Sequence, residues 1–257
     1  EQAKQDRYNL LSGGYLEEKP EHMTHLNSQY LVLKNHPRIL FRGKLDTLEA
    51  ELLLCQMASE HLITPLGEIL ALARRLIRCD VLEEPVPQEK LCGLTESEQR
   101  SRSHRPQDFY DQPHFMPEAA DGMAIARLNR ARCAARAAEL KAVEAFSDRE
   151  GNPTRPDILK ALNRLSSMLY IMMIQIKALI ADGILEGVKS IAPQSDMTAE
   201  DVLGLLEYPP DPAMGDIALP CFKLAKTLRR SPVQIASTLA PLVSGDAIER
   251  AEAVKGY

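Results

Sequence analysis

The chain has 257 residues, of which 45% are hydrophobic and 26% are charged, and its formal net charge is −5. This composition is typical of a globular protein with a real core and excludes a uniformly basic nucleic-acid-binding surface. The chain has five cysteines, and this odd number argues against a disulfide scaffold. No Cys-x-x-Cys pair is present, which argues against a zinc ribbon. A reducing cytoplasm is the simplest compartment for such a chain.

The spacing of apolar residues predicts a series of long amphipathic helices. We expect them at residues 37–60, 66–82, 119–146 and 157–180, with a short helix at 94–99. Thr95 and Glu98 form the expected cap of the short helix. Residues 1–36 and 102–117 are rich in breakers and predict loops, the first with at most one short element. No sheet is expected, so the predicted fold class is all-α.

The most apolar stretch, residues 168–176, contains Gln175 and is followed by Lys177. A membrane span needs roughly 20 apolar residues. The stretch therefore predicts a buried core helix, and we expect no membrane association.

Beyond Asp182 the pattern changes, because Gly183 and Gly187 interrupt it. Short helices are expected at residues 198–206 and, in two pieces, within 218–242. The apolar stripes of this tail are self-contained, which predicts a helical bundle at residues 1–177 and a small, mainly helical C-terminal module at 178–257. An alternative is one continuous rod from Asp157 to about Glu186, with Gly183 as its weak point.

Three charged residues of the Ala-rich helix share one helix face. Arg132, Arg136 and Glu139 follow the spacing i, i+4, i+7. Two guanidinium groups suit phosphate, and a carboxylate suits Mg²⁺ or a ribose hydroxyl. On spacing alone, a solvated ion-pair face is the commoner explanation.

Two further polar groups interrupt apolar helices. Asn163 and Arg164 lie within a strongly apolar helix and need polar partners, either a ligand or another helix. Asp46 shares a face with Arg42 and is placed to pair with an arginine of another helix, or to belong to a helix-start cluster of charges.

The predicted loop at residues 102–117 holds four rings close together. They are Phe109, Tyr110, His114 and Phe115. Long irregular loops inside compact domains are often functional, so this loop is a candidate ligand-binding element.

Taken in this order, these features resemble the cobalamin adenosyltransferases of ethanolamine utilisation and, more distantly, the propanediol-type ATP:corrinoid adenosyltransferases. The resemblance covers residues 22–177, about 60% of the chain. The matching strings are Thr24-His25-Leu26, Pro37-Arg38-Ile39, His114-Phe115-Met116-Pro117, Arg155-Pro156-Asp157 and Ala161-Leu162-Asn163-Arg164-Leu165-Ser166-Ser167. The resemblance implies an adenosyltransferase-type helical bundle that transfers the 5′-deoxyadenosyl group of ATP to Co(I) of cobalamin.

The resemblance also implies roles for the nucleotide side of the site. Arg132 and Arg136 are expected to bind the polyphosphate, and Glu139 and Asn163 to hold ribose or Mg²⁺-linked groups. Asp46 is expected to lock one of the arginines, which makes Asp46 and Arg132 the candidate catalytic residues. The implied ligands are ATP, Mg²⁺ and cobalamin, the last as substrate.

For the corrinoid side, the resemblance implies that the ring-rich loop covers the corrin. Phe109, His114 and Phe115 are the candidate contacts, and their rings are expected to exclude a lower axial ligand. The wider family has a Phe ahead of the loop proline, whereas this chain has His114 three positions before Pro117, so the axial role falls to Phe115 or another ring.

Two departures from the resembled families stand out. Ethanolamine-type members carry a His and three Cys upstream that bind a metal, but residues 8–14 contain no cysteine. His22 and His25 are spaced like ligands, yet without thiolates we interpret them as loop residues and expect no metal site. The asparagine motif ends in Ser167, where the wider family has Asp.

The tail, from about residue 178, resembles the N-terminal domain of arginyl-tRNA synthetases, which contacts tRNA. Lys223, Lys226 and Arg230 are its candidate phosphate contacts, although a solvated helix face explains them equally well. This leaves a rival hypothesis, in which the chain is a tRNA-binding or vestigial fusion protein.

The resemblances imply further partners and a location. We expect a homo-oligomer, an electron donor for cobalt reduction, and a bacterial cytoplasmic protein associated with a microcompartment.

Overall fold

The computed structural model describes residues 7–58 and 60–257. Four strands come first: β1 Tyr8–Leu10, β2 Tyr15–Leu16, β3 Met23–His25 and β4 Tyr30–Leu33. The long helices are α1 Pro37–Gln56, α2 Ile63–Val81, α5 Gly122–Ala145 and α6 Pro156–Ile191. The shorter ones are α3 Glu96–His104, α4 Pro106–Tyr110, α7 Ala199–Leu205, α8 Ala225–Leu228 and α9 Pro232–Leu239. Single 3₁₀ turns are η1 Glu60–Leu62, η2 Ala119–Asp121, η3 Pro212–Met214, η4 Cys221–Lys223 and η5 Ala240–Leu242.

The all-α prediction is wrong, because the strands form a four-stranded mixed sheet in the order β2-β1-β4-β3. β1 runs parallel to β4, and the other two pairings are antiparallel. Gly13 and Gly14 take positive φ of 97° and 81° in the turn between β1 and β2, a backbone that glycine adopts without strain. Strands of two to four residues in a polar segment show no measurable alternation, which is why the sequence pattern indicated a loop.

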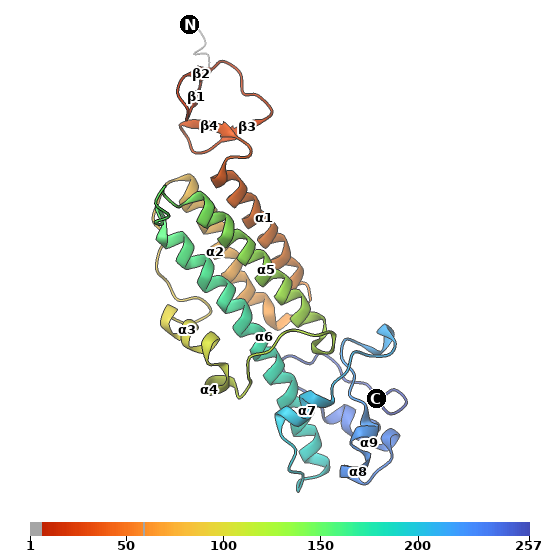
Figure 1. Ribbon diagram of the computed structural model, residues 1–257. Helices are drawn as coiled ribbons and strands as arrows, with labels where there is room; N and C mark the ends of the chain where they lie inside the picture. Colours follow the sequence, from red (N-terminus) through yellow and green to blue (C-terminus); the bar gives the residue numbers. More distant parts are fainter. Residues whose placement is uncertain (1–6, 59) are drawn as a thin grey trace.

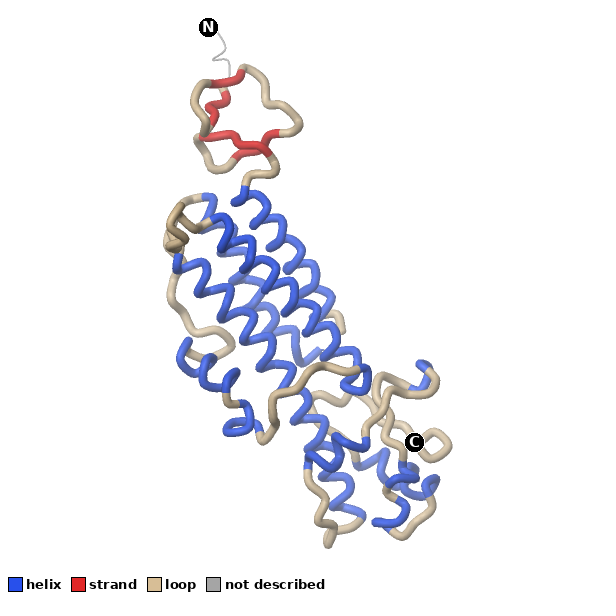
Figure 2. Tube along the Cα trace, in the orientation of Figure 1, coloured by secondary structure: helices blue, strands red, loops and turns tan. Residues whose placement is uncertain are grey.

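The sheet occupies one end of an elongated molecule, the bundle its middle and the tail helices its other end (Figure 1, Figure 2). Asp80 of α2 joins the first two parts. Its buried carboxylate accepts from Arg38 Nε at 2.7 Å and from Arg42 Nε at 2.5 Å. Arg42 also donates through Nη2 to the Leu26 carbonyl, just beyond β3, at 2.6 Å. Since removing one partner of a buried ion pair costs about 3–5 kcal/mol, this cluster fixes the sheet to the bundle.

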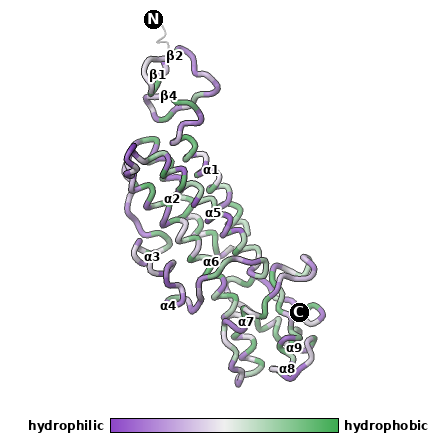
Figure 3. The backbone as a smooth tube through the Cα atoms, in the orientation of Figure 1, coloured by the Kyte–Doolittle hydropathy of each residue, from purple (hydrophilic) through white to green (hydrophobic). Residues whose placement is uncertain are grey.

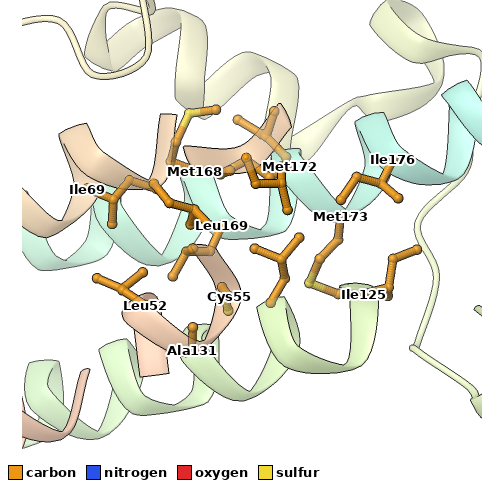
Figure 4. Close-up of a cluster of buried hydrophobic side chains, with 14 of the residues drawn as sticks. Leu52, Cys55, Ile69, Ile125, Ala131, Met168, Leu169, Met172, Met173 and Ile176 are labelled. Atoms are coloured by element: carbon orange, nitrogen blue, oxygen red, sulfur yellow. The ribbon is translucent and has the colours of Figure 1, made fainter. Parts of the chain in front are cut away.

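The bundle consists of α1, α2, α5 and α6 and has an apolar core. Hydrophobic residues recur along the bundle helices (Figure 3), and Figure 4 shows one cluster of this core. A buried stripe of α1 faces fully buried alanines of α5, including Ala131, Ala135 and Ala138. Such small side chains allow close helix contact. Met168, Leu169 and other buried residues of α6 complete this core.

Two helices border the bundle beside α6, in a segment that we predicted to be mostly loop. Thr95 and Glu98 form the expected capping box, but α3 continues to His104 and α4 follows at once. The predicted loop over residues 102–117 is therefore wrong in its first half. After α4, residues 111–118 form neither helix nor strand.

α6 runs without a break for 36 residues, so the continuous rod is confirmed and the predicted interruption at Gly183 and Gly187 is wrong. Both glycines are contact points for the tail. A Cβ on Gly183 would lie 2.3 Å from the Ser244 carbonyl oxygen, and one on Gly187 would lie 2.9 Å from a methyl group of Leu239. Glycine is required at Gly183, where the backbone of the tail approaches, whereas at Gly187 the Leu239 side chain is the near neighbour.

α6 also has the length and hydropathy that a membrane span requires, with a mean hydropathy of 1.7 over its most apolar window. Of that window, 56% is buried inside the protein. Bundle and tail cover the apolar face of α6, so it is a core helix, as its apolar stretch predicted.

A second clamp holds the start of α6. Arg155 donates through Nε and Nη2 to Asp157 at 2.9 and 2.8 Å, and the Val86 amide donates to the same carboxylate at 2.9 Å. The Arg155 guanidinium, with the Val86 amide adding to it, lowers the pKa of Asp157 to about 2. The clamp joins the loop after α2 to the first turn of α6.

We expect Asp157→Asn to lower the free energy of unfolding by about 1–3 kcal/mol at neutral pH, because hydrogen bonds to a charged group are lost. The lowered pKa means that this stabilisation is complete above about pH 4 and is lost as pH falls toward about 2. Urea unfolding at several pH values measures it. Asp182→Asn, at an exposed position of the same helix, is the control, and equal stability of the two variants at pH 7 would contradict the clamp.

Candidate functional site

A cavity of about 500 Å³ lies between α5 and α6, with the end of α3 as its third wall. Its lining residues are Ser103, His104, Arg132, Arg136, Glu139, Leu140, Val143, Asn163, Ser166, Ser167 and Tyr170. All four residues predicted to bind the nucleotide lie among them. The cavity is open to solvent along α5, where Leu140 is 72% exposed.

The polar face of α5 forms one wall. Arg132 is half-buried and donates through Nε and Nη2 to Asn129 Oδ1 at 3.1 and 2.9 Å. Arg136, one turn further, is exposed. Glu139 accepts a hydrogen bond from Asn163 Nδ2 at 3.1 Å. The helix thus presents two guanidinium groups and one carboxylate in a row, which is the arrangement that phosphate recognition needs.

Asn163 forms the opposite wall on α6. The hydroxyl groups of Ser166 and Ser167 both donate to its backbone carbonyl at 3.0 Å. Its side-chain oxygen accepts from Arg164 Nη2, while its nitrogen faces Glu139. Of the two partners predicted for Asn163, a ligand or another helix, the structure places it against the helix α5 at the cavity wall.

The irregular segment 111–118 is fixed to α6 by Tyr170. The Phe115 amide donates to the Tyr170 hydroxyl at 3.1 Å, and His114 Nδ1 lies 3.2 Å from the same oxygen. The His114 ring stacks on Tyr170, with ring centroids 5.8 Å apart and planes 13° apart. Because Tyr170 also lines the cavity, it joins the ring-rich segment to the proposed nucleotide wall.

Phe115 has a cationic neighbour on its other side. Lys177 Nζ lies 4.3 Å from the Phe115 ring centroid and forms an ion pair of 2.6 Å with Asp121. A cation over an aromatic face is favourable, so His114, Phe115 and Lys177 form one assembly along α6. Phe109 lies apart from it on α4, 42% exposed and 5.2 Å beneath the Arg102 guanidinium.

Asp46 lies on the exposed face of α1 and forms no ion pair within 4.0 Å to any described residue. The neighbouring Arg42 pairs with Asp80 instead. Within a single chain, the structure therefore does not bring Asp46 to Arg132 or Arg136, and its proposed role requires a second chain.

The predicted absence of a metal site stays a prediction. His22 and His25 lie at β3, and both are exposed. Among residues 7–58 and 60–257, no group of three His, Cys, Asp or Glu side chains is placed to hold a metal ion.

The tail residues are dispersed. Lys226 and Arg230 are exposed, whereas Lys223 forms an ion pair with Glu207. The tail also borders a larger cavity of about 870 Å³, which lies between it, α5 and α6. None of the predicted nucleotide or corrinoid residues lines that cavity, so the smaller cavity is the better candidate.

Sequence reasoning missed Tyr170 and the role of Arg164. Tyr170 binds a segment 55 residues earlier, which the local pattern does not reveal, whereas Arg164 binds the amide of its neighbour Asn163. A tyrosine amid apolar residues seven positions after Asn163 is the signal that was available, since that spacing returns to the same helix face.

Comparison with known proteins separates the chain into two parts. The family model described as Cobalamin adenosyltransferase matches residues 14–176, and that described as Arginyl tRNA synthetase N terminal domain matches residues 175–257. Corrinoid adenosyltransferase EutT from Salmonella typhimurium is 38% identical over 157 residues, which are 61% of this chain and 59% of that protein. The chain thus spans about three fifths of the length of this relative.

Two other similarities extend the comparison. Arginine–tRNA ligase from Clostridium perfringens is 41% identical over 81 residues, which are 32% of this chain and 13% of the ligase. A variant PduO-type ATP:corrinoid adenosyltransferase from Lactobacillus reuteri, solved with cobalamin and ATP, has a TM-score of 0.48 and 20% identity over 60% of this chain and 86% of that one. The sequence matches confirm both resemblances. Because one family model covers more than half of the chain, the protein belongs to the cobalamin adenosyltransferase family.

Proposed function

We propose that the protein is an ATP:corrinoid adenosyltransferase that makes adenosylcobalamin for ethanolamine utilisation. The observation that carries this proposal is the cavity between α5 and α6, which brings together Arg132, Arg136, Glu139 and Asn163. Its location in the region that is 38% identical to corrinoid adenosyltransferases supports the same activity.

In the proposed reaction, Co(I) attacks the 5′ carbon of ATP. A Co–C bond forms as the C5′–O bond breaks, and the electron pair of that bond leaves with triphosphate. The protein contributes positioning and electrostatic stabilisation. Arg132 and Arg136 neutralise the triphosphate, on which negative charge develops as it leaves. Co(I) itself requires an electron donor, which we place outside this chain.

Mg²⁺ fits the cavity as a counterion of ATP. Glu139 is the one carboxylate among the described lining residues. Mg²⁺ usually keeps several waters and binds one or two carboxylates together with substrate phosphates. Glu139 would hold the ion or its waters, and the ion would neutralise part of the triphosphate charge.

The segment 111–118 is the proposed cover of the corrin. Phe115 supplies an apolar ring with His114 beside it, and Phe109 lies apart from them on α4. An apolar ring beneath cobalt excludes an axial ligand, which makes Co(II) easier to reduce. Tyr170 holds this segment beside the nucleotide, so both substrates meet at α6.

We place a second copy of the chain at the open side of the cavity. Asp46 and Arg136 are both exposed, and neither forms an ion pair with a described residue. Leu140 and Val143 also expose apolar surface to solvent at the open side of the cavity. An arginine of one copy paired with Asp46 of another would give Asp46 its predicted role and close the site in a homo-oligomer.

The direct test is an anaerobic assay with ATP, Mg²⁺ and cobalamin reduced to Co(I). Formation of the Co–C bond is followed by its absorbance change. If the protein is folded and both substrates are present but the spectrum of free Co(I) does not change, the proposed activity is rejected.

Arg136→Ala should lower kcat/KM by about ten- to a hundredfold, mainly through KM for ATP, because a charge-assisted hydrogen bond contributes about 1.5–3 kcal/mol. Helicity should be unchanged, since Arg136 is exposed. Arg130→Ala is the matched control, because Arg130 lies on the same helix but pairs with Glu51 outside the cavity. Identical kinetics for the two variants would mean that Arg136 is an ordinary surface charge and does not bind ATP.

Tyr170→Phe keeps the stacked ring and removes the hydroxyl that binds the Phe115 amide. We expect KM for corrinoid to rise by roughly three- to tenfold, the value of one hydrogen bond, with KM for ATP nearly unchanged. Hydrogen exchange of the Phe115 amide should accelerate without any substrate. Tyr110→Phe, whose hydroxyl binds only Arg102 among the described residues, is the control. If the Phe115 amide stays equally protected, the hydroxyl does not hold the segment.

For the tail, we propose a separate module at residues 178–257 that makes a weak contact with tRNA. Its match to the synthetase N-terminal domain supports this, and Lys226 and Arg230 are exposed. The proposed boundary with the bundle module, residues 1–177, falls inside α6.

The double charge reversal Lys226→Glu with Arg230→Glu should abolish tRNA binding and leave adenosylation intact. Binding of the wild type should fall steeply with salt, as expected for a few phosphate contacts. Truncation after Gly183 tests the boundary: retained adenosylation without tRNA binding supports two modules. Loss of adenosylation in the truncated chain would place the tail within the core of the enzyme.

A further inference from the structure

Arg164 follows Asn163 on α6 and is half-buried. Its Nη2 donates to Asn163 Oδ1, whereas its Nη1 is buried without a hydrogen-bond partner. No described carboxylate lies within 4.0 Å of its guanidinium; the nearby Glu96 pairs with Lys160 at 2.5 Å. Arg164 is thus a desolvated cation whose one hydrogen-bonding contact is the neighbouring amide.

This contact fixes which end of the Asn163 amide faces the cavity. A guanidinium group can only donate and an ionised carboxylate can only accept. With Arg164 on one side and Glu139 on the other, the amide oxygen must face Arg164 and the nitrogen must face Glu139. One lone pair of the Asn163 oxygen is therefore held by the Arg164 cation, and the second N–H of the amide is the donor left for a ligand.

We propose that Arg164 is a positioning residue that presents Asn163 to the nucleotide as a hydrogen-bond donor. This inference rests on the proposed function and sharpens it. Asn163 then binds an acceptor atom of ATP, such as a ribose or phosphate oxygen. It is a poor ligand for Mg²⁺, because Mg²⁺ binds oxygen and the Asn163 oxygen lies beside the Arg164 cation. Of the two tasks first assigned jointly to Glu139 and Asn163, the metal-linked one falls to Glu139 alone.

Burial of Arg164 has a second consequence for the cavity. Arg132, Arg136 and Glu139 line the cavity, and Arg164 lies beside its wall residue Asn163, with Glu96 and Arg100 as further charged neighbours. Interactions of a partly desolvated charge are screened less than those at the surface. Arg164 therefore adds attraction for a polyanion without touching it.

The experiment measures MgATP binding to the full chain by calorimetry, without corrinoid. Arg164→Met should weaken binding about tenfold, and Arg164→Lys should restore part of the loss, because an ammonium group can still donate to the amide. Lys160→Met, one turn earlier on the same helix, is the control and should bind as the wild type does. Unchanged affinity of Arg164→Met would overturn the inference.

Asn163→Asp distinguishes a donor from a metal ligand. The carboxylate keeps an acceptor for Arg164 but has no N–H to offer the nucleotide. We expect weaker MgATP binding that excess Mg²⁺ does not restore, whereas a metal ligand at this position would bind Mg²⁺ equally well or better as Asp. Equal or tighter binding would overturn the inference.

A third measurement needs no ATP. In ¹⁵N-labelled protein, the side-chain amide signals of Asn163 should shift in Arg164→Met and remain in place in Lys160→Met. Unmoved signals would overturn the positioning role. If these signals shift but the wild type binds no ATP, the positioning role stands and the proposed function fails.

Discussion

The structure depends on α6 being one uninterrupted helix. In a helix, residues seven apart return to nearly the same face, and Asn163, Tyr170 and Lys177 follow that spacing. This face of α6 therefore carries three groups in order. Asn163 lies at the proposed nucleotide wall, Tyr170 holds the ring-rich segment, and Lys177 lies over Phe115. The opposite faces of α6 are buried in the core (Figure 4). Packing of the core thus sets the positions of all three polar groups.

The distribution of charge makes the proposed triphosphate site compatible with a net charge of −5. Affinity for a polyanion depends on the local potential and not on the overall charge. Two acidic residues elsewhere, Asp80 and Asp157, are paired with arginines. At the cavity, by contrast, guanidinium groups outnumber carboxylates. The same contrast explains why composition excluded a basic surface without excluding an anion site.

The four long helices could be predicted from the sequence because each has a long apolar period, and the start of α3 could be predicted from its local cap. The sheet could not, because β1 pairs in parallel with β4 across about twenty residues, and strands of three and four residues carry little pattern. Gly183 and Gly187 were misjudged for a related reason. A glycine within a helix pattern indicates either a break or a close contact, and only the approach of residues 239–244 decides between them.

The proposed nucleotide-binding residues could be grouped from spacing and resemblance, but their hydrogen bonds could not be predicted. Glu139 and Asn163 are 24 positions apart, and their contact requires α5 and α6 to pack in one register. Tyr170 likewise reaches a segment 55 residues earlier. Local sequence specifies which side chains are available, whereas helix register specifies which of their atoms remain free.

The continuity of α6 also constrains the tail. A hinge within residues 176–187 would break helical hydrogen bonds and separate buried Ile180 and Ile184 from their neighbours. Close contacts at Gly183 and Gly187 add a steric lock. The tail is therefore held in a fixed orientation, and the larger cavity between it and α5 keeps its shape. Asp121 borders this cavity and pairs with Lys177, whose ammonium group lies over Phe115. Asp121 and Lys177 thus lie between the junction with the tail and the proposed corrinoid cover.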